Sequence, residues 1–302
     1  MPAVSDQIAW TLVRIPTRLV KCVVYSAFFA MSGQATAISS IAAPLSPEDI
    51  ATSFEQRVKM RLMVPLDEQE AYASKLEQVL AGAGLSDMPS QYIILADRNP
   101  LVQAVLIYWK SPEGRWSFIA ASPASTGKTG SFDHFLTPLG VFPHTLANMD
   151  FRAEGTKNQF GIRGYGVKGM RVYDFGWVTG ERGWGPHVQS TMRLQMHATD
   201  PTFLEKKLGQ PQSKGCIRIP AELNVLIDHY GLLDAEYDEA VSRGEHLWVL
   251  QADREPVSTP GRYLVIIDSD RQERPAWLPT AASHGASDSS ASPRRKPLHI
   301  AS

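Results

Sequence analysis

The chain has 302 residues, enough for one large domain or two smaller ones with hydrophobic cores. Its 30 basic and 31 acidic residues argue against nucleic-acid binding, because proteins that bind nucleic acids usually carry a basic excess. The hydrophobic content of 43% is that of an ordinary soluble protein.

Residues 1–37 have the pattern of a secretory signal peptide. Arg14, Arg18 and Lys21 precede the apolar run CVVYSAFFAM, and the small residues of SGQATA follow it. This order predicts cleavage after Ala37 and an exported protein, located in the periplasm or cell envelope. The run is shorter than the roughly 20 residues of a membrane-spanning helix, so no stable membrane span is expected after cleavage. The alternative is an amphipathic N-terminal helix that stays attached.

Cleavage would leave one cysteine in the mature chain. Cys22 lies inside the apolar run, and Cys216 is the second of the two cysteines. An unpaired thiol in an exported protein points to a reactive group or to pairing between molecules. The structural alternative is that Cys216 is a small buried hydrophobic residue.

Residues 38–90 are predicted to form a short helical region. Ser46, followed by a proline and two acidic residues, is a typical helix start. Pro65 interrupts the helical pattern, Asp67 opens a second helix, and Gly82 closes it. We expect this region to lead into the catalytic part of the chain.

Residues 91–267 are predicted to form one mainly β domain. Strand-forming residues dominate YIILADRNPLVQAVLIYWK and RWSFIAASPAS, which predicts two or three strands. We expect turns and a short strand in TGKTGSFDHFLTPLGVFPH, and long loops around one or two strands in the Gly- and aromatic-rich residues 148–186. STMRLQMHAT alternates polar and apolar side chains as a strand does.

A helix and late strands are expected after Cys216. PAELNVLIDHYGLLD is amphipathic and predicts a helix that ends at Gly231, while HLWVLQ and GRYLVIID are typical of strands. From Asp268 the chain is polar, and residues 268–302 are predicted to form a disordered tail. The fold class is therefore α+β, mainly β with helices.

Cys216 needs a base if it is a nucleophile. A thiol attacks as the thiolate, and an unperturbed pKa of about 8.5 leaves little thiolate at neutral pH. His197 ends the strand TMRLQMH, nineteen residues before Cys216, and the Pro- and Gly-containing connection can bring both to one end of a sheet. The other histidines are expected to be solvated or structurally satisfied: His134, His144, His187, His229, His246, His284 and His299.

The residues beside Cys216 in PQSKGCIRIP suit acyl transfer. Gly215 allows a tight turn, so that amide N–H groups can point at one oxyanion. Arg218 shares the face of Cys216 in an extended segment and can hold a substrate carboxylate, its plain alternative being a surface ion pair.

The pattern H…SKGCIR resembles the signature of L,D-transpeptidases of the YkuD type. In that family a histidine is followed, after a similar gap, by Ser/Thr-His-Gly-Cys, an apolar residue and Asn or Arg. Here fifteen residues separate His197 from Ser213, and STGK…TPLGVF looks like an upstream stretch of the family. The resemblance covers Gln91 to Gln251. It implies an L,D-transpeptidase-type β-sandwich with a helix after the catalytic cysteine, preceded by the short helical region.

The resemblance also implies roles for individual residues. Cys216 matches the nucleophile and His197 the base, Ser213 and Gly215 match residues that shape the pocket, and Arg218 matches a position often held by arginine. No metal or organic cofactor is implied.

Other positions have more open interpretations. Lys214 stands where the family usually has histidine, and it can supply positive charge near the thiolate or the oxyanion. Tyr165, Trp177 and Trp184 suit a lid that excludes water, with plain packing as the alternative. Thr137 is expected to fix the fold of a turn.

By the same resemblance, the substrates are the stem peptides of peptidoglycan. The nucleophile would expel the terminal D-alanine to form a thioester, and an amine from a second stem would resolve it into a cross-link. We expect a monomer with no nucleic-acid partner.

Three alternatives remain open. Water instead of an amine would make the protein an L,D-carboxypeptidase or another wall hydrolase. Without catalysis it would be a wall-binding module. A sortase-like transpeptidase also uses His, Cys and Arg, but with different spacing. TGKT is not a phosphate-binding loop, because Ser122 stands where the first glycine is required.

Overall fold

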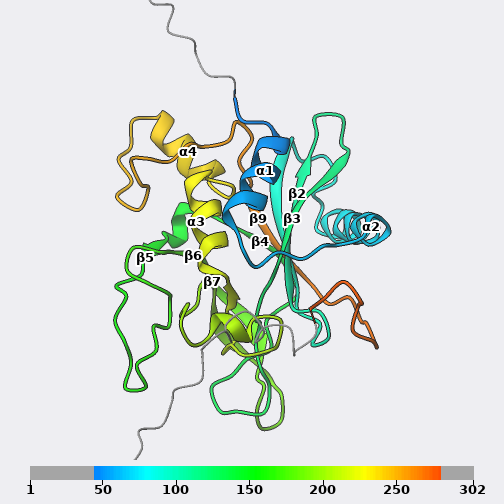
Figure 1. Ribbon diagram of the computed structural model, residues 1–302, viewed down its shortest axis with the longest axis vertical. Helices are drawn as coiled ribbons and strands as arrows, with labels where there is room; N and C mark the ends of the chain where they lie inside the picture. The colour runs from blue at the N-terminus through cyan, green and yellow to red at the C-terminus, as the bar shows by residue number, and fades with distance from the viewer. Residues whose placement is uncertain (1–43, 280–302) are drawn as a thin grey trace, which may run out of the picture. The chain divides into compact units, whose positions relative to one another are not determined.

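Two β-sheets and four α-helices make up residues 44–279, the part of the chain that the computed structural model describes (Figure 1). The expected α+β class is therefore confirmed. The predicted signal peptide with Cys22, and residues 280–302 of the predicted tail, lie outside the described residues.

The two predicted N-terminal helices are both present. α1 spans Pro47–Arg57, and Ser46 caps it by accepting a hydrogen bond from the backbone N–H of Asp49 at 3.2 Å. α2 spans Leu66–Gly82 and buries Tyr72, Leu76 and Leu80.

Sheet A has five strands in the order β3-β2-β1-β9-β4. β9 runs parallel to β1 and antiparallel to β4, and the other neighbours are antiparallel. Its strands are β1 (Gln91–Asp97), β2 (Ala104–Lys110), β3 (Trp116–Pro123), β4 (Gly140–Pro143) and β9 (Tyr263–Ile267).

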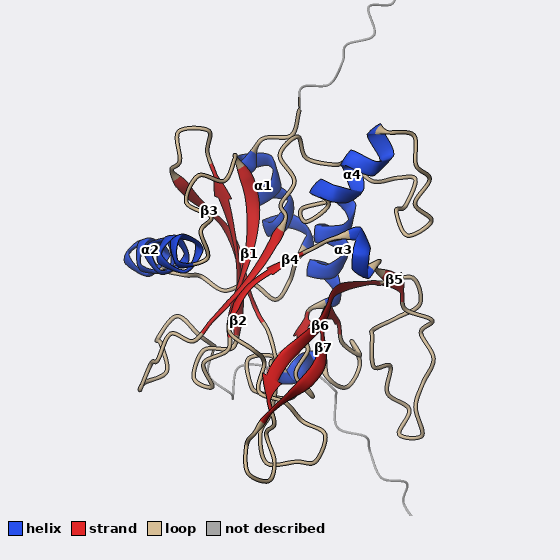
Figure 2. Cartoon of the chain, turned by 180° about the vertical axis from the view of Figure 1, so that it is seen from behind, coloured by secondary structure: helices blue, strands red, loops and turns tan. Residues whose placement is uncertain are grey.

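Both faces of sheet A are covered, because alternate side chains of its strands enter different cores. Ile93 and Leu95 of β1 pack on the side of α2, whereas Ile94 and Ala96 pack toward α1, sheet B and the helix after Cys216. Figure 2 shows α2 on one side of this sheet and the other helices on the opposite side.

Sheet B has four strands in the order β5-β6-β7-β8, of which β7 and β8 are parallel. Its strands are β5 (Phe151–Arg152), β6 (Arg171–Glu181), β7 (Gln189–Ala198) and β8 (Ile217–Ile219). After β8 come α3 (Ala221–His229) and α4 (Ala235–Ser242), and single 3-10 turns lie at Leu146–Asn148 and Glu205–Lys207.

Two predictions were wrong in this region. HLWVLQ forms turns instead of a strand, because Leu247 and Val249 pack on Tyr237 and Ala240 of α4, a helix that the sequence analysis did not predict. Residues 268–279 are packed rather than disordered. In this segment the Trp277 ring meets Tyr72 at 6.4 Å between centroids and Leu278 is buried, contacts that a polar composition does not indicate.

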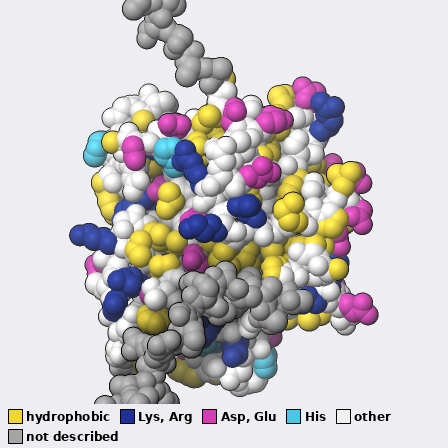
Figure 3. All heavy atoms as spheres, in the orientation of Figure 1, with side chains coloured by type: hydrophobic (Ala, Val, Ile, Leu, Met, Phe, Trp, Pro, Cys, Tyr) yellow, Lys and Arg dark blue, Asp and Glu magenta, His cyan; other side chains and the backbone are white. Residues whose placement is uncertain are grey.

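Basic and acidic side chains are interspersed over the described residues of the face shown in Figure 3. None of the helices within residues 44–279 is both long and apolar enough to cross a bilayer.

Candidate active site

Strand β7 separates the core from the site by simple alternation. Met192, Leu194 and Met196 point into the main core, so the residues between them, Arg193, Gln195 and His197, lie on the opposite face of sheet B. We call this face of sheet B the site face.

The pairing of β7 with β8 brings the predicted nucleophile to the predicted base. His197 lies directly opposite Arg218, and Cys216 comes just before β8 begins. Because side chains two residues apart share a face, Cys216 and Arg218 both lie on the site face with His197. An isolated bridge adds Ser125 on the far side of Arg218.

Cys216 rests as a neutral thiol. Its side chain is half-buried, and Sγ donates a weak hydrogen bond to the carbonyl oxygen of Arg193 at 3.9 Å. Within residues 44–279, no hydrogen bond joins Sγ to His197. Burial raises the pKa of the thiol and outweighs the opposing effects of a backbone hydrogen bond and of the Arg218 charge.

His197 is a neutral base. Its Nδ1 lies 2.6 Å from the carbonyl oxygen of Ala198, which can only accept, so Nδ1 carries the proton and Nε2 is left as an acceptor. Burial lowers the pKa of His197 to about 4; the bond to Ala198 opposes this effect and the Arg218 charge adds to it. The imidazole can therefore accept the thiol proton at neutral pH.

Tyr165 lies in the loop between β5 and β6 and packs against His197. Its ring meets His197 edge-on at 4.7 Å between centroids, and its hydroxyl donates to Oε1 of Gln195 at 3.1 Å. Gln195 is held in turn by Asp174, whose carboxylate accepts from Nε2 at 2.8 Å. Tyr165 also borders a cavity of about 440 Å³ formed with residues 151–156.

Within residues 44–279, neither of the two tryptophans that were expected to form a lid makes an aromatic contact with Tyr165. Trp177 is 67% exposed on β6, and the Arg193 guanidinium sits 5.5 Å from its ring centre. Trp184 packs edge-on against Phe135 at 5.1 Å in the loop between β6 and β7.

The turn that carries Cys216 is fixed by buried hydroxyl groups. Ser213 Oγ accepts from the N–H of Gly215 at 3.0 Å and donates to the carbonyl oxygen of Cys216 at 2.5 Å. Thr137 Oγ1 donates to the carbonyl oxygen of Gly215 at 2.8 Å. The N–H and the carbonyl group of Gly215 are therefore both bonded within the described residues.

Gly215 itself is required by the turn. Its φ of +128° is strained for residues with a side chain, and an added Cβ would lie 2.7 Å from Cε of Met192. Only glycine therefore fits between the turn and β7 without a shift of its neighbours.

Lys214 does not reach the thiol. Its ammonium group forms an exposed ion pair with Asp133 at 2.8 Å. The expectation that Lys214 places positive charge beside the thiolate or the oxyanion is therefore wrong for this conformation.

Arg218 is the cation that faces the pair. One terminal nitrogen donates to the carbonyl oxygen of Gln212 at 3.2 Å. Its Nε is buried and has no hydrogen-bond partner among the described residues, and neither has the hydroxyl of Ser125. The expected surface ion pair is absent among residues 44–279, which leaves the charge available to an anionic ligand.

Three further residues of the site face were not predicted from the sequence: Gln195, Asp174 and Ser125. Gln195 was detectable, since it lies two residues before His197 on the same strand and so shares its face. Asp174 lies on β6 and Ser125 in the segment after β3, and only the pairing of these segments shows their positions.

The arrangement can carry out nucleophilic acyl transfer, with a thiol, a neutral imidazole and an unpaired guanidinium on one face. Within residues 44–279, no three His, Cys, Asp or Glu side chains are grouped as metal ligands. No protein-family model matches the chain, and no curated protein matches it.

Proposed function

We propose that the protein is an L,D-transpeptidase that cross-links peptidoglycan stem peptides. The observation that carries the proposal is the β7–β8 register, which sets Cys216, His197 and Arg218 on one face. The resemblance of SKGCIR to the family signature and the helix after Cys216 support the finer assignment to an L,D-transpeptidase-type sandwich.

In the first half-reaction Cys216 attacks the carbonyl carbon of the third stem residue. Nε2 of His197 takes the thiol proton as the S–C bond forms, which avoids a separate thiolate in a buried site. The C–N bond to the terminal D-alanine then breaks, and His197 returns the proton to the leaving amine. A thioester on Cys216 remains.

In the second half-reaction an amine from another stem attacks the thioester. His197 accepts a proton from that amine and passes it to the departing thiolate, so that both groups regain their neutral forms. The cavity of about 440 Å³ beside Tyr165 is the place from which we expect the acceptor to approach.

Arg218 is proposed to bind the carboxylate of the terminal D-alanine. The buried guanidinium has an unsatisfied Nε and lies beside the residue that attacks. The carboxylate at the C-terminus of a stem peptide would complete the hydrogen bonds of the guanidinium. An uncharged internal peptide bond would not pair with its charge. This makes the enzyme specific for chain ends.

We further propose that the protein acts as an exported monomer in the periplasm or cell envelope. The predicted signal peptide in residues 1–37 supports export.

Hydrolysis of the same thioester is the second candidate. Tyr165 is 40% exposed and Cys216 is only half-buried, which favours access of water to the acyl group. An L,D-carboxypeptidase would share every step up to the thioester.

One experiment separates these outcomes. The protein is incubated with a stem tetrapeptide, with and without an amine acceptor, and the products are followed by mass spectrometry. We expect a cross-linked dimer with the wild type and none with Cys216→Ala. Tripeptide without dimer would identify a carboxypeptidase, and no product from folded protein would leave a wall-binding module.

A further inference from the structure

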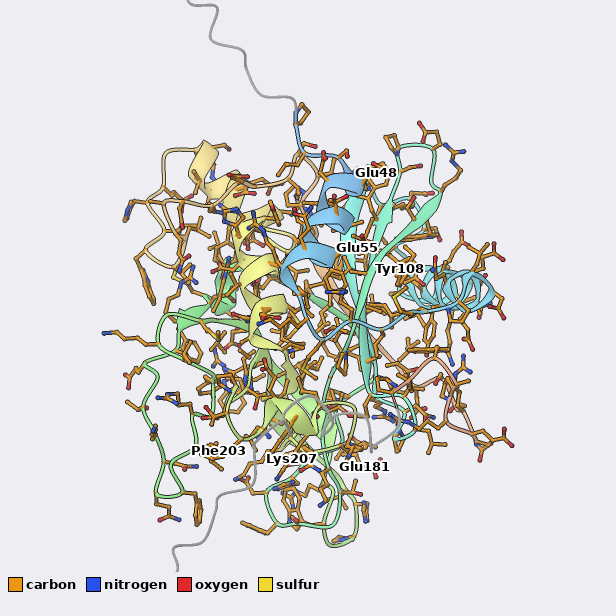
Figure 4. All side chains as sticks on the ribbon, viewed as in Figure 1. Glu48, Glu55, Tyr108, Glu181, Phe203 and Lys207 are labelled. Carbon is orange, nitrogen blue, oxygen red and sulfur yellow. The ribbon has the colours of Figure 1, made fainter. Side chains whose placement is uncertain are left out.

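The site face continues beyond Cys216 as an exposed strip. Directly paired residues of β6 and β7 form it, and we call it the Trp177 strip. Its members are the pairs Trp177–Arg193, Thr179–Thr191 and Glu181–Gln189. Alternation places them on the same face as His197, while Val178 and Met192 between them pack on the core. Glu181, labelled in Figure 4, marks the end of the strip furthest from His197.

The Trp177 strip begins at the nucleophile. The carbonyl group of Arg193 accepts the hydrogen bond from the Cys216 thiol, and Arg193 is the partner of Trp177 across the strands. From Trp177 to Glu181 the strip extends for roughly 13 Å along the strand. A substrate whose peptide is held at the thiol can therefore lay its other part along these strands.

The side chains of the strip suit a ligand that is polar but uncharged and has a flat apolar face. Trp177 offers an exposed indole ring, backed by the Arg193 guanidinium. Arg193 is itself paired with Asp174 at 2.8 Å, so it does not attract an anion. The exposed side chains of Thr179, Thr191 and Gln189 supply hydroxyl and amide groups.

These features favour a saccharide over a protein partner. A pyranose ring can stack one apolar face on the indole while its hydroxyl and acetamido groups bond to the threonines and the glutamine. An apolar protein surface would leave those polar side chains without partners, which is costly.

We infer that the Trp177 strip binds the glycan part of the substrate, a chain of N-acylated amino sugars, alongside the thiol. The identification of this glycan as cell-wall material rests on the proposed function. The binding of the saccharide itself is independent of the proposed function, because it requires no reaction at Cys216.

The test is calorimetric titration of the folded protein with the tetrasaccharide of N-acetylglucosamine. We expect saturable binding to the wild type and a dissociation constant raised about tenfold or more in Trp177→Ala. Trp177→Phe, which keeps a flat ring, should retain most of the affinity. Trp248→Ala is the matched control, since Trp248 is 60% exposed in a loop outside the strip, and it should bind as the wild type does.

Three results would overturn the inference: no binding of the tetrasaccharide, equal affinity of wild type and Trp177→Ala, or an equal loss in Trp248→Ala. If sugar-free stem peptide binding depended on Trp177 while saccharide binding did not, the strip would be a peptide site instead. Turnover of the free tetrapeptide reports separately on the proposed function. Saccharide binding without turnover would remove that function and keep the inference, and turnover without saccharide binding would do the reverse.

Discussion

Burial sets the resting charges of the two central residues. It raises the pKa of the Cys216 thiol and lowers that of the His197 imidazole, so the neutral pair is favoured over thiolate and imidazolium. Cys216 therefore loses its proton only as its sulfur bonds to a substrate carbonyl carbon, so that a free thiolate does not accumulate. A neutral pair also resists oxidation, which proceeds through the thiolate.

This resting state predicts slow alkylation of Cys216 at neutral pH. Because burial raises the pKa of Cys216 above that of a free thiol, the neutral thiol predominates at pH 7. We expect the rate with iodoacetamide to rise about tenfold per pH unit between pH 7 and 8. Peptide mass spectrometry measures it and distinguishes Cys216 from Cys22. A rate that stays constant from pH 5 to 8 would instead indicate a thiolate–imidazolium pair.

At the scale of elements, the turn from Ser213 to Cys216 fits between β7 and the segment that carries Thr137. Within this turn Gly215 has a φ of +128°, a backbone conformation that favours glycine. Its neighbours hold it from both sides, because Thr137 bonds its carbonyl group and Ser213 its N–H. The position of the sulfur therefore depends on side chains from separate elements.

Gly215→Ala should disturb both stability and the thiol. The new Cβ would meet Met192 at 2.7 Å and Phe135 at 3.1 Å, in addition to the strained φ, so we expect a loss of about 1–3 kcal/mol in the free energy of unfolding. Urea denaturation measures this loss. Gly130→Ala is the control, because Gly130 also has a positive φ but no atom lies within 4 Å of an added Cβ. Equal losses in both variants would show that crowding by Met192 and Phe135 is unimportant.

The elements that were predicted correctly are those with local signals. Ser46 and Pro65 delimit helices by capping and by a missing donor, and β7 shows its alternation over ten residues. α4 was missed because it has only eight residues, and its Tyr237 and Ala240 are buried by Leu247 and Val249, a contact that the local sequence does not show. HLWVLQ alternates like a strand, but it packs on α4 instead of pairing with a sheet edge.

The site also contains residues that could be predicted from the local sequence and residues that could not. The spacing of His197 and Cys216 was readable because strand β7 and the turn at Gly215 both lie in one continuous stretch of sequence. Gln195, Asp174 and Ser125 join them through strand pairing, and the sequence contains no local sign of which residues will face each other. The ion pair of Lys214 with Asp133 depends on a loop conformation for the same reason.

At the scale of the whole molecule, a buried ionic cluster joins sheet B to α3 and α4. Arg171 is fully buried and pairs with Asp150 at 2.7 Å and with Asp234 at 2.8 Å. His144 donates both ring N–H groups, one to the carbonyl oxygen of Leu233 and one to Asp150. Burial acts to lower the pKa of His144, but the charge and the hydrogen bond of Asp150 outweigh it, so the pKa is raised.

The two buried histidines should limit stability from opposite sides of the pH scale. His144, with a raised pKa, stabilises the folded chain at low pH, and this contribution is lost as pH rises through its folded pKa. His197, with its pKa lowered from 6.5 to about 4, stabilises above pH 6.5 and costs stability as pH falls toward 4.

His197→Gln should remove the acid side of this dependence. The shift of His197 corresponds to about 3 kcal/mol in the free energy of unfolding between pH 6.5 and 4, which the wild type loses and the variant keeps. Urea denaturation at several pH values measures the difference. His187→Gln, at an exposed histidine, should follow the wild type. Parallel curves for wild type and His197→Gln would contradict the lowered pKa of His197.

The position of β9 in sheet A determines when the sheet can be completed. β9 is the last strand in the chain, yet it lies inside sheet A, between β1 and β4. β1, β2 and β3 are consecutive in the chain and pair with each other, whereas β4 has β9 as its neighbour in the sheet and can pair only with this last strand. A chain that ends before residue 263 would contain Cys216 but would lack the strand that joins β1 to β4. The last strand is therefore needed to complete sheet A over the main core, on which sheet B also packs.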